Sequence, residues 1–446
     1  MTSHPPGPAG QRLLVVSCEY DADTSPQGLR WVKLSRELAA LGWAVDVVTL
    51  ERPETTAGLQ SPSLRVFPVF PGPYAALLRL VQARSSHSGI HLAADAAQAN
   101  SNQLTERRDH EQQRLNWKGM LEAAVRRLLG FGLYPDLRAE AVPFIRACVR
   151  ELAGTHRYAA AVLSHEPPLA LGLSDILHRS RIPVIADLGD PVCAAYTPRR
   201  WRRRALEVEG EICSHAAAVV TTSEATLQLL QGRHPHFSAE ATVIPQGFDP
   251  SPRGESLVKP IPLRPDGPMR IVYTGRFYRF RDPSETIRAV RATSGIELVM
   301  AVPDVPAWLD QQLLRAPSIR LTARLRHEEA RSLQNTADVL LVIGNDDPTQ
   351  TPGKLFEYLG VGAPIIYVTR HQDDPGAQLV RVLRRGIVVQ GMAETSAALA
   401  CLREQRKEGG FQSRFDLSGE SVKTYSWPAS AKRYSDLISR LAAARV

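Results

Sequence analysis

Long apolar runs and paired cysteines are both missing from this chain. No stretch approaches the ~18 uncharged apolar residues that a membrane helix requires, and residues 1–10 lack the apolar core of a signal peptide. The five cysteines are scattered and lack the spacing of a metal site: Cys18, Cys148, Cys193, Cys213 and Cys401. We therefore expect a cytoplasmic protein with reduced thiols, no disulfide and no zinc.

Two common phosphate-binding patterns are also missing. The segment from Thr24 to Arg30, after the first predicted strand, contains Gly28 but no Gly-x-Gly-x-x-Gly, which argues against a nicotinamide or flavin enzyme. Gly353 and Lys354 are followed by leucine and lack the upstream glycine of a Walker loop. Because zinc-finger spacing and the aromatic signature of an RNA-recognition fold are missing too, nucleic acid is not an expected partner.

Positive charge is in excess, with a net charge of +8 and a sequence pI near 9.4, which favours an acidic partner such as a phosphorylated substrate or an anionic membrane. The densest basic segment, residues 199–204, is followed by Glu207, Glu209 and Glu211. A solvated helix face that pairs with these glutamates is the favoured interpretation. Peripheral contact with anionic headgroups at the inner face of the membrane is the alternative, and Trp201 supports it.

The length of 446 residues exceeds what one hydrophobic core usually serves, so we expect two domains. The predicted boundaries are 1–250 for the first domain and 251–425 for the second, joined where proline and glycine recur. Residues 426–446 are predicted to form a helix that is a candidate to cross back to the first domain. The polar, alanine-rich stretch 84–114 has no sustained period and is predicted to be a mobile insertion.

Buried strands alternate with helix-length stretches in both halves of the chain. Arg12–Ser17, a helix ending at Gly42, and Val45–Leu50 form a parallel crossover unit. The further predicted strands are Leu64–Val69, Ala159–Ser164, Val184–Leu188, Ala217–Thr222, Met269–Thr274, Ile296–Val302, Ile319–Thr322, Val339–Ile343, Ile365–Val368 and Ile387–Val389. This pattern predicts an α/β protein with two doubly wound parallel-sheet, Rossmann-like domains that face each other across a cleft, where such sheets bind ligands.

One segment, from Thr351 to Gly360, carries the clearest chemical signal. Proline and glycine at its helix start leave the first backbone N–H groups open, so the amides from Gly353 to Leu355 and the helix dipole predict a phosphate site. Glu357 follows one turn later, where it can accept hydrogen bonds from the sugar hydroxyls of a nucleotide. The spacing therefore indicates a nucleotide-sugar site, with an ordinary capped helix as the alternative.

The same segment resembles the donor-binding helix of the retaining glycosyltransferases of the GT-B fold, family 4. The resemblance extends over most of the chain, because Val243–Asp249 is similar to the strand and turn before the family's linker. Tyr273–Arg276 is similar to the opening of its donor domain. It implies that Arg276 and a second cation, Arg279 or Arg281, neutralise the donor diphosphate, since fixed cations stabilise a departing diphosphate more than the bound donor.

The resemblance also implies roles for residues of the first domain. His165, within His165-Glu166-Pro167, resembles a histidine that lies beside the transferred sugar. Asp190, within Asp187–Pro191, resembles an acceptor-side aspartate, although glycine stands at position 189 where the family often has arginine. The loop that contains Gly28 corresponds to one that approaches donor and acceptor.

One position departs from the family pattern. The family usually has a glutamate against the sugar ring eight positions before the residue that corresponds to Glu357, and here that position is Thr349. The polar loop is kept, so Thr349, Gln350 and Thr351 are the predicted sugar-side contacts of the donor. Asp346 or Asp347 is a candidate substitute for the missing carboxylate.

The resemblance implies a retaining glycosyltransferase that moves a sugar from a nucleotide diphosphate sugar to a glycan, lipid-linked or small-molecule acceptor. The expected catalytic residues are His165, Asp190, Arg276 and Arg281, and the donor-binding set is Gly28, Thr349, Gln350, Thr351, Gly353, Lys354, Leu355 and Glu357. No metal and no cofactor beyond the donor are required, since cationic side chains take the role of a magnesium ion. A non-catalytic nucleotide-sugar binding or scaffold subunit and a sugar-nucleotide epimerase of the same architecture are the alternatives.

Overall fold

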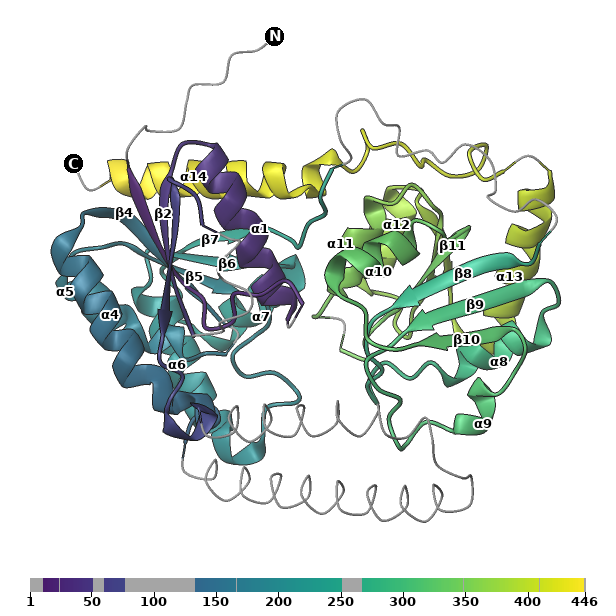
Figure 1. Ribbon diagram of the computed structural model, residues 1–446, viewed down its shortest axis with the longest axis horizontal. Helices are drawn as coiled ribbons and strands as arrows, with labels where there is room; N and C mark the ends of the chain where they lie inside the picture. Colours follow the sequence, from purple (N-terminus) through teal and green to yellow (C-terminus); the bar gives the residue numbers. More distant parts are fainter. Residues whose placement is uncertain are drawn as a thin grey trace, which may run out of the picture.

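A computed structural model describes the chain over residues 11–23, 25–50, 60–76, 133–165, 167–250, 267–347, 349–408 and 410–444. These residues form two parallel β-sheets, each covered by helices on both faces (Figure 1). The predicted insertion at 84–114 lies outside the described residues. No helix in the described ranges is both long enough and apolar enough to cross a bilayer.

The first sheet contains seven parallel strands in the order β3-β2-β1-β4-β5-β6-β7. The strands are β1 Arg12–Val16, β2 Ala44–Leu50, β3 Leu64–Val69, β4 Tyr158–Ser164, β5 Val184–Leu188, β6 Ala218–Thr221 and β7 Glu240–Val243. Their central members are runs of valine, leucine, isoleucine and alanine that are buried on both faces, as is typical of parallel sheets. Along β1, Leu13 and Val15 pack into one core, whereas Leu14 and Val16 pack into the other.

The helices of the first domain are α1 Pro26–Ala40, α4 Val142–Thr155, α5 Ser174–Arg179, α6 Arg202–His215 and α7 Glu224–Arg233, with short 3-10 turns η2 Leu137–Ala141, η3 Ala170–Leu173 and η4 Arg199–Trp201. Helix α1 begins with Pro26 after Ser25, whose hydroxyl accepts from the Gly28 amide. Helix α7 begins in the same way, because the Ser223 hydroxyl accepts from the Thr226 amide.

The second sheet contains six parallel strands in the order β10-β9-β8-β11-β12-β13. The strands are β8 Met269–Thr274, β9 Ile296–Ala301, β10 Ile319–Thr322, β11 Val339–Ile343, β12 Ile365–Val368 and β13 Gly386–Val389. Its helices are α8 Ser284–Ala292, α9 Gln311–Leu314, α10 His327–Gln334, α11 Gly353–Leu359, α12 Pro375–Val382 and α13 Gly391–Lys407, with the turn η5 Lys423–Tyr425. Two separate buried clusters cover its faces.

The last helix, α14 Trp427–Ala443, packs on the first domain although it follows the second in sequence (Figure 1). It contacts α1 and β4 and contributes Trp427, Ala431, Tyr434, Leu437 and Ile438 to the core that contains Leu13 and Val15. At its start, the amide of Trp427 donates to the Phe248 carbonyl, and the Phe248 amide donates to the Tyr425 carbonyl. The linker and the return segment therefore run together.

The predicted fold class is confirmed: two doubly wound parallel sheets, each in its own α/β unit. The predicted strands Leu64–Val69, Val184–Leu188, Met269–Thr274, Val339–Ile343 and Ile365–Val368 have the observed bounds. The predicted strand Ile319–Thr322 also has the observed bounds, and the remaining predicted strands differ by one residue at one or both ends.

Candidate functional site

The candidate residues lie where strands of both sheets end. His165 follows β4 and Asp190 follows β5 in the first domain, while Arg276 follows β8 in the second. The loop from Asn345 to Thr351 follows β11 and leads into α11. Since the strands of each sheet are parallel, their carboxyl ends share one edge, and this edge is where open α/β sheets bind ligands.

His165 is buried, with 6% of its surface exposed, and its amide donates to the Asp187 carbonyl at 3.0 Å. The imidazole Nδ1 is buried without a hydrogen-bond partner among the described residues. Burial lowers the pKa of His165 to about 4, against the opposing effect of Glu209 and Asp187. The ring is therefore neutral near pH 7.

This burial predicts a pH effect on stability. Folded His165 stays neutral down to about pH 4, whereas in the unfolded chain a histidine takes up a proton below about pH 6.5. The contribution of His165 to the free energy of unfolding is therefore complete above pH 6.5. It is lost as the pH falls from 6.5 to 4, by up to roughly 3 kcal/mol. Urea unfolding of wild type and His165→Gln across this range should give a smaller decline for the variant. If the free energy of unfolding fell equally with pH in wild type and His165→Gln, this account would be contradicted.

Asp190 is half-buried and faces groups of the other domain. Its carboxylate accepts a hydrogen bond from the Tyr196 hydroxyl at 3.0 Å. Burial raises the pKa of Asp190; the Asp347 carboxylate raises it further, while Tyr196 and Arg281 act to lower it. Asp347 and Arg281 belong to the second domain, so charged groups of the second domain affect the pKa of Asp190 in the first.

Arg281 is the second-domain cation that faces this cluster. Its Nε and Nη2 atoms donate to the Asn345 side-chain carbonyl at 2.9 and 2.6 Å. Arg279, the alternative in the sequence, instead lies over the Trp308 ring at 5.8 Å. Arg276 is exposed, and its backbone carbonyl accepts from the Tyr273 hydroxyl. Arg281 also lies over an aromatic ring, that of Tyr278 at 5.7 Å, and of the two arginines it is the one held by Asn345.

The loop after β11 is ordered by its own side chains. The Thr349 hydroxyl and amide both donate to Asp347 Oδ1, at 2.6 and 2.9 Å. Asn345 Nδ2 donates to the Gln350 carbonyl at 2.9 Å, and Thr351 is half-buried. Thr349 therefore turns its side chain back to Asp347, and Asp347 is the carboxylate of this loop that raises the pKa of Asp190.

Glu357 and Lys354 form an ion pair on α11, with 2.7 Å between Nζ and Oε2. Only 13% of the Glu357 side chain is exposed. At the helix start, the Leu355 amide donates to the Pro352 carbonyl at 3.0 Å, and the Leu355 side chain is fully buried. Of the three amides predicted for phosphate, those of Gly353 and Lys354 are thus the ones left for a ligand.

A pocket lies beside Glu357, between the linker, α10 and α11. Its lining consists of Gly247, Phe248, Asp249, His327, Arg331, Gln334, Asn335, Glu357, Gly360, Val361 and Trp427. Asp249 accepts from Lys33 of α1 at 2.8 Å and from Arg331 of α10 at 2.7 Å. The sequence analysis named Glu357 and the segment Val243–Asp249, but it did not predict the contacts of Asp249 with Lys33 and Arg331, because charged residues on separate helices carry no motif that links them.

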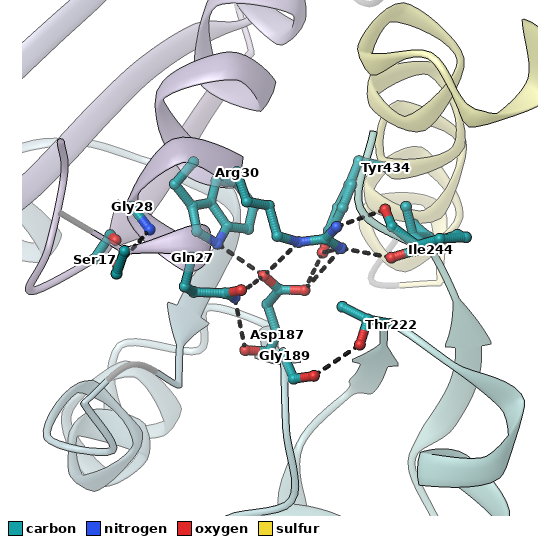
Figure 2. A network of polar contacts seen from close by, with 12 residues as sticks. Ser17, Gln27, Gly28, Arg30, Asp187, Gly189, Thr222, Ile244 and Tyr434 are labelled. Atoms are coloured by element: carbon teal, nitrogen blue, oxygen red, sulfur yellow. Dashed lines mark hydrogen bonds and ion pairs between the residues drawn. The ribbon is translucent and has the colours of Figure 1, made fainter. Parts of the chain in front are cut away.

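A buried polar network is centred on Asp187 (Figure 2), and the sequence analysis did not predict it. Asp187 is fully buried and accepts from Arg30 at 3.0 and 3.1 Å. It also accepts from the Trp31 indole at 2.8 Å and from the Tyr434 hydroxyl at 2.5 Å. Burial and the neighbouring Asp187 raise the pKa of Tyr434, so the phenol stays protonated and donates.

The network joins four parts of the chain. Arg30 also donates to the Ile244 and Pro245 carbonyls, at 2.8 and 2.7 Å, so α1 is tied to the segment that enters the linker. Tyr434 belongs to α14, and Asp187 lies three residues before Asp190. The end of β5, the linker entry and the returning helix are thus fixed to each other.

Two glycines are required by close packing near this network. A Cβ at Gly28 would lie 2.6 Å from the Asp21 carbonyl oxygen, and one at Gly189 would lie 2.8 Å from Gln27 Oε1. Gln27 Nε2 donates to Asp187 at 2.6 Å. Gly28 lies inside α1 and is buried, so its absent side chain allows the α1 start to pack on the loop after β1.

The basic segment forms η4 and the start of α6. Arg203 and Arg204 pair with Glu207 at 3.0 and 3.2 Å, as the solvated-helix interpretation predicts, whereas Glu209 is fully buried and pairs with Arg233 and His234. Arg200 lies over the half-buried Trp201 ring, 5.5 Å from its centroid.

No protein-family model matches the chain, and no curated protein matches it in sequence. Solved structures do match in fold. Anabaena HepE, solved in complex with UDP and glucose, is 11% identical, with 96% of this chain and 100% of that chain covered and a TM-score of 0.61. The same protein has been solved with UDP-glucose.

A glycosyltransferase from Rickettsia africae is 10% identical, with 97% and 98% of the two chains covered and a TM-score of 0.60. The N-terminal domain of Candida albicans trehalose-6-phosphate phosphatase is 12% identical, with 99% and 98% covered and a TM-score of 0.58. At these identities the likeness establishes the fold alone: the chain has the two-domain GT-B fold found in glycosyltransferases.

Proposed function

We propose that this protein is a retaining glycosyltransferase, related in mechanism to family 4, that transfers a sugar from a nucleotide diphosphate sugar to an acceptor. The observation that carries the proposal is the docking of the loop after β11 on the first domain through the Thr349 carbonyl, which brings Asp347 and Arg281 within electrostatic range of Asp190. This places a fixed cation and carboxylates at the carboxyl ends of strands in both sheets. The similar HepE structure, solved with UDP-glucose, supports a nucleotide-sugar donor.

The donor diphosphate is proposed to bind between the α11 start and the two arginines. The amides of Gly353 and Lys354 would donate to phosphate oxygens, with Arg276 and Arg281 as the balancing cations. Arg281 is already held by Asn345, so its charge is fixed before the sugar–phosphate bond breaks. A cation fixed in advance stabilises the departing diphosphate at little reorganisation cost.

The transferred sugar is proposed to lie between His165 and the loop after β11. The neutral His165 ring offers its unpartnered Nδ1 to a sugar hydroxyl. Thr349, Gln350 and Thr351 border the sugar from the second domain. Asp190 is proposed to contact the acceptor, and no cofactor beyond the donor enters this scheme.

The test is release of nucleoside diphosphate from a panel of nucleotide sugars, with and without acceptor extracts. Donors are chosen by thermal shift, since a ligand that binds only the folded state raises the unfolding temperature. Release with a matching glycosylated product supports the proposal. A protein that binds a donor tightly but neither hydrolyses nor transfers it would instead be a binding subunit, and one that only interconverts donor sugars would be an epimerase.

Glu357 gives a prediction for the nucleoside. We place its carboxylate on ribose hydroxyls, so Glu357→Gln should weaken nucleoside diphosphate binding by roughly 1.5 to 3 kcal/mol, because charge-assisted hydrogen bonds are lost. Calorimetry with the free diphosphate measures this. Glu328→Gln on the exposed face of α10 is the matched control and should bind as wild type does. Equal affinity in Glu357→Gln and wild type would remove Glu357 from the nucleoside site.

Peripheral contact with anionic membrane is a second part of the proposal. Arg199, Arg200 and Arg202 are exposed beside Tyr196, of which 55% is exposed. Reversing two of these charges, Arg199→Glu with Arg200→Glu, should weaken binding to phosphatidylserine vesicles by about 1 kcal/mol or more per residue in co-sedimentation. Equal and negligible sedimentation of both proteins would leave the segment as a solvated helix face.

A further inference from the structure

Two hydroxyls of the first domain hold a carbonyl of the second. The Ser223 and Thr226 hydroxyls, at the start of α7, donate to the Thr349 carbonyl oxygen at 2.9 and 3.0 Å. Ser223 is 8% exposed and Thr226 is 1% exposed, so both bonds are shielded from water. The carbonyl also lies at the amino end of α7, where the helix dipole favours its partial negative charge.

The carbonyl belongs to the loop that carries the candidate donor residues. Within this loop, the Thr349 hydroxyl donates to Asp347, and the carbonyl of the next residue, Gln350, accepts from the Asn345 side chain. Asn345 in turn accepts from Arg281. An unbroken chain of hydrogen bonds and one peptide link therefore runs from the α7 start to Arg281.

We propose that Ser223 and Thr226 are positioning residues for glycosyl transfer: by holding the Thr349 carbonyl, they fix the donor-side loop against the first domain when the two domains come together. The inference rests on the proposed function above. Donor binding to the second domain alone does not need these hydroxyls, whereas transfer does, because the docked loop holds its donor-side residues against the first domain, where the acceptor is proposed to bind.

The test compares three proteins. Ser223→Ala/Thr226→Val removes both donors and keeps the side-chain shapes near those of wild type. Ser223→Thr/Thr226→Ser keeps both hydroxyls and is the matched control. Because Ser223→Ala also removes the α7 cap, urea unfolding and the single variant Thr226→Val are measured alongside.

We expect turnover to fall by roughly tenfold or more in Ser223→Ala/Thr226→Val, with nucleoside diphosphate affinity kept within about twofold. The control pair should keep most of its turnover. Unchanged turnover in the double variant would overturn the inference. So would a loss of nucleoside diphosphate affinity equal to the loss of turnover, since that would indicate a general defect of the second domain.

A second readout does not depend on activity. Dyes at the exposed Cys401 of α13 and at an introduced Glu151→Cys on α4, in a Cys148→Ser background, report the separation of the domains by energy transfer. The double variant should show lower transfer efficiency than wild type and the control pair. Equal transfer efficiency in all three proteins would overturn the inference. Failure of wild type to bind any nucleotide sugar would overturn the proposed function, but the separation of the domains could still be compared among the three proteins.

Discussion

Asp187→Ala should lower the free energy of unfolding by about 3 to 5 kcal/mol, because it leaves the buried Arg30 guanidinium without its partner. Both side chains of the pair are fully buried. The Tyr434 hydroxyl and Trp31 indole would lose an acceptor at the same time. Urea denaturation of the intact chain measures the effect.

The matched control is Asp175→Ala, which removes an exposed ion pair with Arg146. That pair has a similar separation, 2.7 Å, but its side chains are 31% and 43% exposed, so its loss should cost less than about 1 kcal/mol. If Asp187→Ala and Asp175→Ala lowered the free energy of unfolding by similar amounts, burial of the Arg30–Asp187 pair would not determine its contribution to stability.

Arg281→Ala should lower turnover by roughly 100-fold, or about 2.7 kcal/mol in the barrier, because a preorganised cation is lost where negative charge develops. Arg281→Lys should recover only part of the activity, since lysine cannot donate through a planar fork to Asn345. Release of nucleoside diphosphate from the selected donor measures both variants.

Arg288→Ala on the exposed face of α8 is the control for loss of one positive charge and should retain wild-type turnover. If Arg281→Ala and Arg288→Ala behaved alike, the diphosphate would have to be stabilised elsewhere, and Arg276 would be the remaining candidate. Loss of folding in Arg281→Ala is checked by its urea unfolding curve.

Most of the fold could be predicted from the sequence because the two sheets are parallel and buried. Their strands, such as Val339–Ile343, are short apolar runs separated by helix-length segments, and this alternation is visible without any tertiary information. Strand β7, Glu240–Val243, is less apolar and lies at the edge of its sheet, so its signal was weak and only its last residue was recognised.

The contacts between distant residues could not be predicted in the same way. Arg30 lies on the buried face of α1 and Asp187 lies within an apolar strand. Each is therefore a charged residue at a position where its own segment predicts an apolar one. Nothing local pairs two residues that are 157 positions apart, or adds Tyr434 from the last helix. The Ser223–Thr349 contact is of the same kind, since the sequence shows only that Ser223 is a suitable helix cap.

The central claim is tested most directly by a proton NMR time course of wild-type protein with a nucleotide sugar that binds and an acceptor. The proposal predicts that the donor anomeric signal falls while nucleoside diphosphate and a new anomeric signal of the same configuration appear together. An unchanged donor spectrum for every nucleotide sugar that binds would contradict it.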